Sequence, residues 1–490
     1  MRKGSITIFF ALILSIIIVL ICTSTESVKM MCARTQIANG ADVGMYSLFA
    51  QYDRDLLNRY HLFYVDAAYG TGALQMGEAY QTVEAYMEPI LHQNYLDLSI
   101  ASGGITSFVL ATDCNGQPFF NQAVAHMRDT LDRPGIQFLA KKVLEDSQAA
   151  AYWQEEGEQI EGYRFLAAYE EEMARAGNES AQAGAEQPGP EEMPSETVVE
   201  NPIESPVDNP IDIIREIQSR GVLELSLADS AALSEQETDI SRLLSSRELE
   251  QGMGTLYPAA VKGSVRENVL FQEYLMQNCG MYLRPSGGDL KYQMEYILGK
   301  SGSDKENLER MARRLLQIRE GMNFAFLCTD PQRRAQSTAL AAAIASGFLV
   351  APSVEVIEQA LLFCWAFGES ILEVKALLDG NRVPKEKNSL NWILPLENLS
   401  GLLIELSVQQ PEGEESGMAY GDYLRALLYL EPEDKKVMAS MDMIEADIRS
   451  QPGRQNFRLD CCLEAMEAAV DVEVNETRSY TVLHRYGYHL

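Results

Sequence analysis

An uncharged run between Lys3 and Glu26 constrains what this chain can fold into more than any other feature of its sequence. Residues 6–22 read ITIFFALILSIIIVLIC, and about 20 apolar residues in a helix cross the roughly 30 Å hydrocarbon core of a bilayer. Because a lone segment in lipid must satisfy its own backbone hydrogen bonds, we predict one transmembrane helix. The positive charges of Arg2 and Lys3 favour a cytoplasmic N-terminus. The sequence therefore predicts a single-pass plasma-membrane protein with the bulk of the chain extracytoplasmic.

Three alternatives to a single retained anchor compete. A cleaved signal peptide would end near 24–26, where Ser-Thr-Glu is a weak cleavage site after a long apolar run. A lipoprotein would be acylated at Cys22, but the preceding 19–21 lacks small residues. A second span at 335–354 is uncharged, yet it contains Gln, Ser, Thr and Pro and is less hydrophobic than the first segment. We favour the retained anchor.

The acidic balance of the chain excludes a general nucleic-acid binder. The formal net charge is −31 over 490 residues, and phosphate binding relies on Lys and Arg. Residues 145–212 hold 18 acidic and 2 basic residues. Within them, 176–212 has six prolines, no Lys or Arg and few large apolar residues, which predicts an acidic, Pro-rich disordered linker.

Apolar periodicity predicts an α+β protein that is mainly helical, with a transmembrane helix that continues into a long stalk helix and an outer domain in two halves with a few antiparallel strands. The predicted parts are a cytoplasmic tip and anchor, a mostly helical first half, the linker and an α+β second half, over 1–26, 27–175, 176–212 and 213–490.

Individual elements follow from the same patterns. Helices are predicted at 27–60, 73–95, 119–129, 131–175, 210–220, 234–251, 303–327, from Asp330, and at 353–378, 420–430 and 433–450. Strands are predicted at 100–112, at 290–299 and as a closing antiparallel pair within 459–488. Ser303 and Glu306 have the spacing of a capping box. We interpret Gly40 and Gly44 as tolerated helix glycines, with close helix packing as the alternative.

No pattern in the sequence indicates chemistry. The five histidines lack metal-site spacing, and Gly299-Lys300-Ser301 lacks the earlier glycine of a phosphate loop, which indicates a turn. No nucleophile-elbow motif is present. The cysteines leave open a disulfide among Cys114, Cys279 and either 461 or 462. We therefore predict no catalytic residues, no cofactor and no metal, and a protein that is not an enzyme.

The N-terminal stretch Gly4-Ser5-Ile6-Thr7-Ile8-Phe9-Phe10-Ala11-Leu12 resembles the start of TadE/TadG pseudopilin-like proteins of tight-adherence pili. Phe10, Ala11, Leu12 and the later Glu26 match that class. The resemblance implies prepilin-type processing between Gly4 and Ser5. The pilin pattern has Glu five residues after the glycine, where this chain has Phe9.

Further segments extend the resemblance to nearly the whole chain except the acidic middle. They are KGSITIFFALIL, FAQYDRDLLNRYHLF, EYILGKSGSDKENL and CWAFGESILEVKALLDGNRVP. Together they resemble an uncharacterised family of single-anchor Gram-positive proteins, often encoded beside tight-adherence pilus genes. The family has no established activity, so the resemblance implies location and context.

These observations favour a non-catalytic, membrane-anchored cell-envelope protein, either pseudopilin-like or accessory to a tight-adherence pilus or surface assembly. Its partners would be the bilayer, through residues 6–22, and other pseudopilin-like subunits, through the N-terminal helix. The alternatives are an extracytoplasmic binding or adhesion module and a wall-polymer hydrolase.

Overall fold

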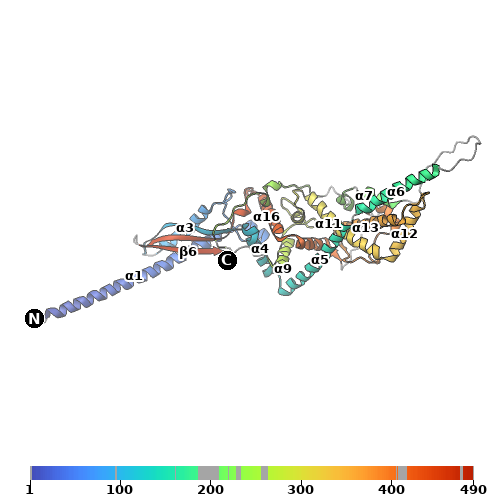
Figure 1. Ribbon diagram of the computed structural model, residues 1–490. Helices are drawn as coiled ribbons and strands as arrows, with labels where there is room; N and C mark the ends of the chain where they lie inside the picture. Colours follow the sequence, from blue (N-terminus) through green and yellow to red (C-terminus); the bar gives the residue numbers. More distant parts are fainter. Residues whose placement is uncertain are drawn as a thin grey trace, which may run out of the picture. The chain divides into compact units, whose positions relative to one another are not determined.

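The computed structural model divides the chain into two compact units (Figure 1). Unit 1 contains Met1–Asp132, Ser241–Tyr274 and Glu433–Leu490, and unit 2 contains Arg133–Ile240 and Leu275–Pro432. The structure describes residues 3–93, 96–160, 162–185, 209–218, 220–227, 233–254, 256, 263–403, 406, 417–474 and 478–488. The fold is mainly helical with a few antiparallel strands, as predicted.

Unit 1 begins with the helix α1 (Lys3–Phe49), which is continuous over 47 residues. The predicted helix over 27–60 is interrupted after Phe49, where the chain turns and starts α2 (Arg54–Tyr60). The break occurs because the Asp53 side chain caps α2, accepting hydrogen bonds from the backbone N–H groups of Asp55 and Leu56 at 2.9 Å each.

A four-stranded antiparallel sheet joins the two ends of the chain in unit 1. The strand β5 (Cys462–Val474) pairs along one edge with β2 (Leu98–Leu110). Along its other edge it pairs with β6 (Arg478–Gly487) and, further on, with the short β1 (Val65–Asp66). The predicted strand at 100–112 and the closing antiparallel pair are confirmed.

The core of unit 1 lies between this sheet and the helices α1 and α3 (Met76–Leu91). Alternate residues of β5 face the helices, since side chains in a strand point to opposite faces with a period of two. The buried members on that face are Met466, Ala468, Val470, Val472 and Val474.

The glycines of α1 are used for close helix packing. A Cβ atom added at Gly44 would lie 2.7 Å from the Val83 carbonyl oxygen of α3, and one at Gly40 would lie 3.2 Å from Met87 Cγ. Our preferred interpretation of two tolerated glycines is therefore wrong. The absence of a side chain at Gly44 allows α3 to lie directly against α1.

Three further helices complete unit 1. The boundary between the units falls within one of them, α9 (Val265–Asn278), whose residues up to Tyr274 belong to unit 1. Phe119 and Phe271 meet in the core with ring centroids 5.6 Å apart. The helices are α4 (Asp113–Thr130), α9 (Val265–Asn278) and α16 (Glu433–Arg449), with short 3₁₀ turns at η2 (Ile240–Arg242), η3 (Leu244–Ser246) and η5 (Leu459–Cys461).

Unit 2 is a helical assembly around α11 and α13, which pack on each other. Its helices are α5 (Arg133–Gln159), α6 (Gly162–Ala185), α7 (Pro210–Gln218), α8 (Val222–Ser226), α10 (Gln293–Gly299), α11 (Asp304–Thr329), α12 (Pro331–Ala345), α13 (Val354–Leu378) and α15 (Tyr420–Leu430). The 3₁₀ turn η4 (Leu396–Gly401) and the paired strands β3 (Arg382–Val383) and β4 (Met418–Ala419) complete it.

Two predicted elements are wrong. The strand predicted at 290–299 is mostly helix α10, because the apparently polar positions Gln293 and Glu295 are as buried as their apolar neighbours. The helix predicted at 234–251 forms only short 3₁₀ turns. Its backbone N–H groups donate to carboxylates instead of to helical carbonyls: Ser245 to Asp442 at 2.8 Å and Glu250 to Asp460 at 3.1 Å.

The Ser303 capping box also does not form. Ser303 is the N-cap of α11, but its side chain makes no capping hydrogen bond. The Glu306 carboxylate instead accepts from the Ser301 hydroxyl. The neighbouring Asp330 does cap α12, accepting from the N–H groups of Gln332 and Arg333.

The two units differ from the consecutive halves that the sequence suggested. The C-terminal strands belong with the N-terminal helix because β5 pairs with β2 across more than 350 residues. The linker predicted at 176–212 is also shorter: α6 continues to Ala185 and α7 begins at Pro210, so residues 176–185 are helical. The rest of that prediction, 186–208, lies outside the described residues.

Candidate functional site

The residues predicted to form the anchor motif all lie on α1 and are not packed against the rest of the chain. Phe10 is 64% exposed and Leu12 58%, and Ala11 and Glu26 are also exposed. Gly4 and Ser5 lie in the first turns of the helix; their surroundings are outside what the structure describes. Processing between them stays a prediction.

Among the described residues, one helix is long and apolar enough to span a membrane, and it starts near the N-terminus. Its most apolar 18-residue window has a mean hydropathy of 3.0 and no buried residue. The stretch at 335–354, considered as a second span, contains the end of α12 at Ala345 and a turn instead. An apolar surface that the fold leaves uncovered requires an apolar environment, which a bilayer supplies.

The same helix becomes buried one turn beyond Lys29. Ala33, Ile37, Ala41 and Met45 recur every four residues and are at most 1% exposed. Gln36 reinforces this contact because its amide nitrogen donates to the carbonyl oxygens of Ile90 and Leu91 at the end of α3, at 2.6 and 3.2 Å. The uncovered apolar half of α1 is thus continuous with the core of unit 1.

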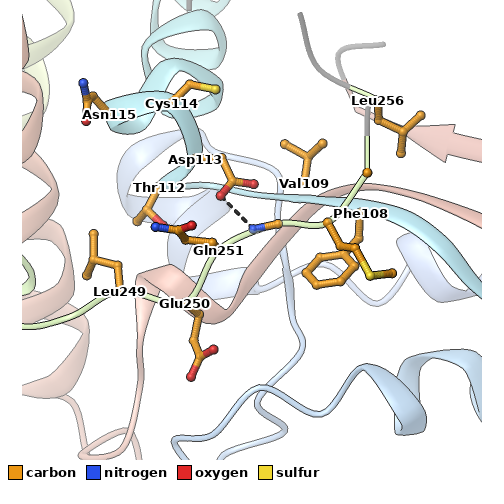
Figure 2. A pocket seen from close by; sticks show the side chains of 13 residues that line it. Phe108, Val109, Thr112, Asp113, Cys114, Asn115, Leu249, Glu250, Gln251 and Leu256 are labelled. Carbon is orange, nitrogen blue, oxygen red and sulfur yellow. Dashed lines mark hydrogen bonds between the residues drawn. The ribbon is translucent and has the colours of Figure 1, made fainter. Parts of the chain in front are cut away.

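A pocket of about 380 Å³ lies in unit 1 where β2 ends (Figure 2). Asp113 forms part of its wall, and both of its carboxylate oxygens are in use. They accept hydrogen bonds from the backbone N–H groups of Leu110 at 2.8 Å and Gly252 at 2.9 Å. Burial raises the pKa of Asp113. The carboxylate holds the 249–254 segment in place, and these contacts give it a structural role.

A left-handed turn follows Asp113 at the rim of this pocket. Cys114, Asn115 and Gly116 have φ values of 51°, 59° and 82°. Gly116 suits this turn because its φ of 82° would be strained for a residue with a side chain. Cys114 is exposed. The described residues that line the pocket include no histidine. Among them, Cys114 therefore has no histidine to activate it as a nucleophile.

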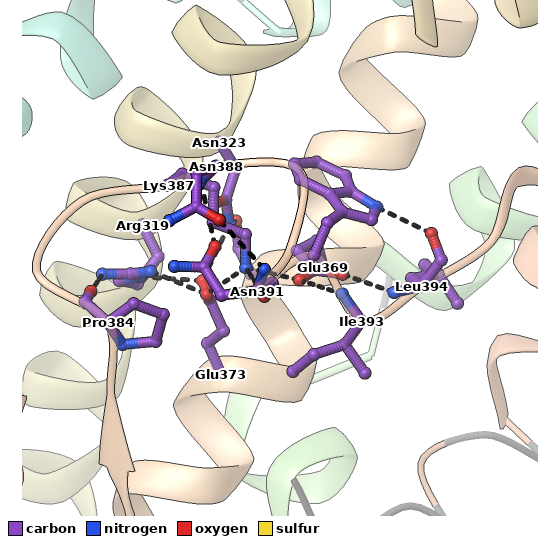
Figure 3. Close-up of polar contacts among 12 residues, drawn as sticks. Arg319, Asn323, Glu369, Glu373, Pro384, Lys387, Asn388, Asn391, Ile393 and Leu394 are labelled. Atoms are coloured by element: carbon purple, nitrogen blue, oxygen red, sulfur yellow. Dashed lines mark hydrogen bonds and ion pairs between the residues drawn. The ribbon is translucent and has the colours of Figure 1, made fainter. Parts of the chain in front are cut away.

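Unit 2 contains a fully buried group of charged side chains (Figure 3). Arg319 of α11 makes two hydrogen bonds to Glu373 of α13, at 2.6 and 2.8 Å. Lys387 bridges Glu373 at 2.7 Å and Glu369 at 2.5 Å. Each of these four side chains is at most 1% exposed. Two cations and two carboxylates make the group neutral overall, which is how buried charges are tolerated.

This buried charge network fixes a loop to the helices. Glu369 accepts hydrogen bonds from the backbone N–H groups of Ile393 and Leu394, and Arg319 donates to the Pro384 carbonyl at 2.8 Å. Burial alone would raise the pKa of Glu373. The positive charges of Arg319 and Lys387 have the larger effect and lower this pKa to about 2. The network links three segments and is closed to solvent, so its role is structural.

The remaining sequence candidates have structural roles as well. Lys300 is the left-handed C-cap of α10, so Gly299-Lys300-Ser301 is a turn, as predicted. All eight cysteines are free, and no disulfide joins Cys114, Cys279 or the adjacent pair at 461 and 462. Groups of three or more His, Cys, Asp or Glu side chains suited to a metal ion do not occur in the described part of the chain.

Sequence reasoning did not identify the buried charge network. A signal was present: Glu369 and Glu373 lie four residues apart inside the apolar helix predicted at 353–378, so both fall on one helix face. Their partners Arg319 and Lys387 come from other segments, and no local sequence pattern predicts that these residues pair with the two glutamates.

The fold is that of a mainly helical α+β protein with an apolar N-terminal helix fixed to a sheet-containing unit. The chain belongs to a family of unknown function (DUF5702), whose model matches residues 200–474, more than half of the chain. No curated protein matches the sequence. No solved structure matches the fold.

Proposed function

We propose that this protein is a non-catalytic, single-pass component of the cell envelope that is pseudopilin-like or accessory to a tight-adherence pilus or similar surface assembly. One observation carries the proposal: α1 runs without a break from an uncovered apolar half into the core of unit 1. A rigid connection of this kind transmits the position of the anchor directly to the outer domain.

The proposed orientation places Arg2 and Lys3 in the cytoplasm and the described units outside the plasma membrane. The positive charges at the start of the chain support it. The acidic composition of the remaining chain is compatible with an exposed, solvated surface.

The pseudopilin-like role would rest on lateral packing of anchors. Phe10 and Leu12 are available for it because their side chains are 64% and 58% exposed. The resemblance of residues 4–12 to TadE/TadG proteins supports the same role. Phe9 replaces the glutamate of the pilin pattern, so packing between anchors would rely on apolar contacts and not on a charge at that position.

Photo-crosslinking in the native membrane tests this role. A benzophenone amino acid at Phe10 should give adducts with a second copy or with pilus subunits. The matched control is the same group at Phe138, which is 73% exposed on α5. Adducts of equal yield at both positions, or unchanged pilus assembly and adhesion after deletion of the gene, would contradict the proposal.

Mass spectrometry of the native N-terminus adds an independent test of the anchor. A retained anchor gives Met1 or, after prepilin-type processing, Ser5 as the first residue. A chain that begins near Glu26 would show that the apolar segment is a cleaved signal peptide, and the membrane role would then fail.

A further inference from the structure

A cavity of about 450 Å³ in unit 1 is lined largely by aromatic side chains. Its size falls within the roughly 300–1,000 Å³ typical of small-molecule sites. One wall is formed by aromatic residues from the end of α1 and the turn after it, from the segment after α2, and from the end of β6 and the residue that follows it. They are Tyr46, Phe49, Tyr52, Phe63, Tyr486 and Tyr488.

These six rings form a continuous series. Phe49 lies 5.0 Å from Tyr486 and 5.3 Å from Tyr488, measured between ring centroids. Phe63 continues the series at 5.7 Å from Tyr488. Tyr46 and Tyr52 lie at its two ends, 6.0 Å from Tyr486 and 5.6 Å from Phe63. The Tyr488 hydroxyl donates to the Phe49 carbonyl oxygen and so fixes its ring.

The opposite wall is one face of α4. Gln122, Ala125, His126 and Asp129 have the three-and-four spacing that places residues on the same side of a helix. Gln122 is buried and bonded to the backbone of Phe63, so it supports the wall. Asp129 is exposed and gives the cavity a carboxylate.

The charge of the cavity selects its ligand. The faces of aromatic rings carry partial negative charge, and the Asp129 carboxylate adds a full negative charge. Burial and the neighbouring His61, whose ring centroid lies 4.3 Å away, lower the pKa of His126 and so disfavour its charged form. Among the twelve described lining residues there is no Lys or Arg. A cationic ligand would complement the negative potential of this site.

We propose that the aromatic cavity of unit 1 binds an organic ammonium group, with quaternary ammonium such as choline as the best fit. Aromatic rings attract such cations through their quadrupoles, and the attraction grows when water is excluded. A carboxylate beside the rings adds a charge contact. The proposal does not depend on an assembly role for the protein.

The ligand does not come from the headgroups of the membrane that holds α1. Tyr46 lies 24 residues beyond Cys22 on the same continuous helix, which is about 36 Å along its axis. The occupant is therefore a soluble ammonium compound or an ammonium group on an envelope polymer. Free choline and phosphocholine represent these two sources.

Titration calorimetry on the full chain tests the proposal. The protein is placed in phosphatidylglycerol nanodiscs, which contain no quaternary ammonium. Choline should bind with a millimolar Kd, and its neutral isostere 3,3-dimethyl-1-butanol should bind at least about tenfold more weakly. Binding of choline alone assigns a free ammonium ligand, and binding of phosphocholine as well assigns an ester-linked one.

Two variants and a matched control locate the site. Tyr46→Ala, at a side chain that is 64% exposed, and Asp129→Asn should each weaken choline binding at least about threefold. Tyr86→Ala, at a 46% exposed tyrosine outside the cavity, should leave it unchanged. The proposal is overturned if choline does not bind up to roughly 50 mM, if the neutral isostere or a neutral disaccharide binds as tightly, or if Tyr46→Ala behaves like Tyr86→Ala.

Discussion

At the scale of single residues, Gly44 shows how closely the anchor helix is joined to unit 1. A side chain at this position would meet both the carbonyl oxygen of Val83, at 2.7 Å, and its Cγ1, at 2.9 Å. A backbone oxygen cannot rotate away as a flexible side chain can, so α3 would have to move as a whole. The packing of α1 against α3 therefore depends on the absence of a side chain at position 44.

Gly44→Ala should lower the free energy of unfolding by about 1–3 kcal/mol, the usual cost of overpacking a core. Urea unfolding of the full chain in nanodiscs measures it. The control is Gly77→Ala in α3, where a Cβ atom would meet nothing within 4 Å. That change should be neutral or slightly stabilising. Equal effects at the two glycines would mean that α3 does not lie against α1 in this way.

Glu295 is a second residue with a measurable consequence. It is fully buried in unit 2, where its carboxylate accepts hydrogen bonds from the Tyr420 hydroxyl at 2.6 Å and from the backbone N–H of Tyr282 at 2.8 Å. Burial raises its pKa from 4.5 to about 7, more than these bonds lower it. The folded protein therefore holds a proton here that the unfolded chain releases.

This raised pKa predicts a loss of stability with rising pH. Because the folded pKa lies above the unfolded one, the free energy of unfolding should fall between pH 4.5 and about 7 and then level off, by about 3 kcal/mol in total. Unfolding of wild type and Glu295→Gln at pH 4.5 and pH 8 isolates the effect. Relative to wild type, the free energy of unfolding of the variant should be higher at pH 8 than at pH 4.5. If variant and wild type differ by the same amount at both pH values, the raised pKa of Glu295 is refuted.

At the scale of elements, the buried charge network decides how the loop 384–394 is fixed to α11 and α13. Lys387 touches both Glu369 and Glu373, so its removal would leave two buried carboxylates with only Arg319 to balance them. Breaking a buried pair by removing one partner is far more costly than removing a surface pair.

Lys387→Met should therefore destabilise the protein by about 3–5 kcal/mol, and the double variant Lys387→Met with Glu369→Gln should recover part of that loss. The control is Lys141→Met, which removes a surface pair with Glu145 whose side chains are 77% and 64% exposed. It should change stability by less than about 0.5 kcal/mol. A small loss at Lys387, similar to the control, would show that water reaches the network.

The elements that sequence patterns predicted well are those with strong local signals. The helices at 353–378, 420–430 and 433–450 are found within one residue of their predicted bounds, because apolar periodicity and flanking turn residues mark them. The helix predicted at 234–251 failed because distant carboxylates on Asp442 and Asp460 take its backbone N–H groups. That competition is tertiary and leaves no trace in the local sequence.

The candidate sites follow the same rule. The apolar N-terminal helix was predictable because a single run of residues defines it. The aromatic cavity was not, since Tyr486 and Tyr488 lie more than 400 residues beyond the other four rings along the chain. The pairing of β5 with β2 was missed for the same reason, although both strands were predicted.

At the scale of the whole molecule, the proposed function requires that α1 passes from the bilayer into unit 1. The chain carries its own reporters of this path, because Cys22 lies in the predicted span, Cys32 lies ten residues beyond it on the same helix, and Cys114 is exposed in unit 1. The other five cysteines are buried or half-buried, which slows their reaction in the folded protein.

Labelling of intact cells with a membrane-impermeant maleimide, followed by peptide mass spectrometry, tests this central claim most directly. Cys32 and Cys114 should be modified in intact cells, whereas Cys22 should be protected until the membrane is dissolved. Cys32 and Cys114 that react only after the cells are opened would place the described units in the cytoplasm and contradict the proposed topology.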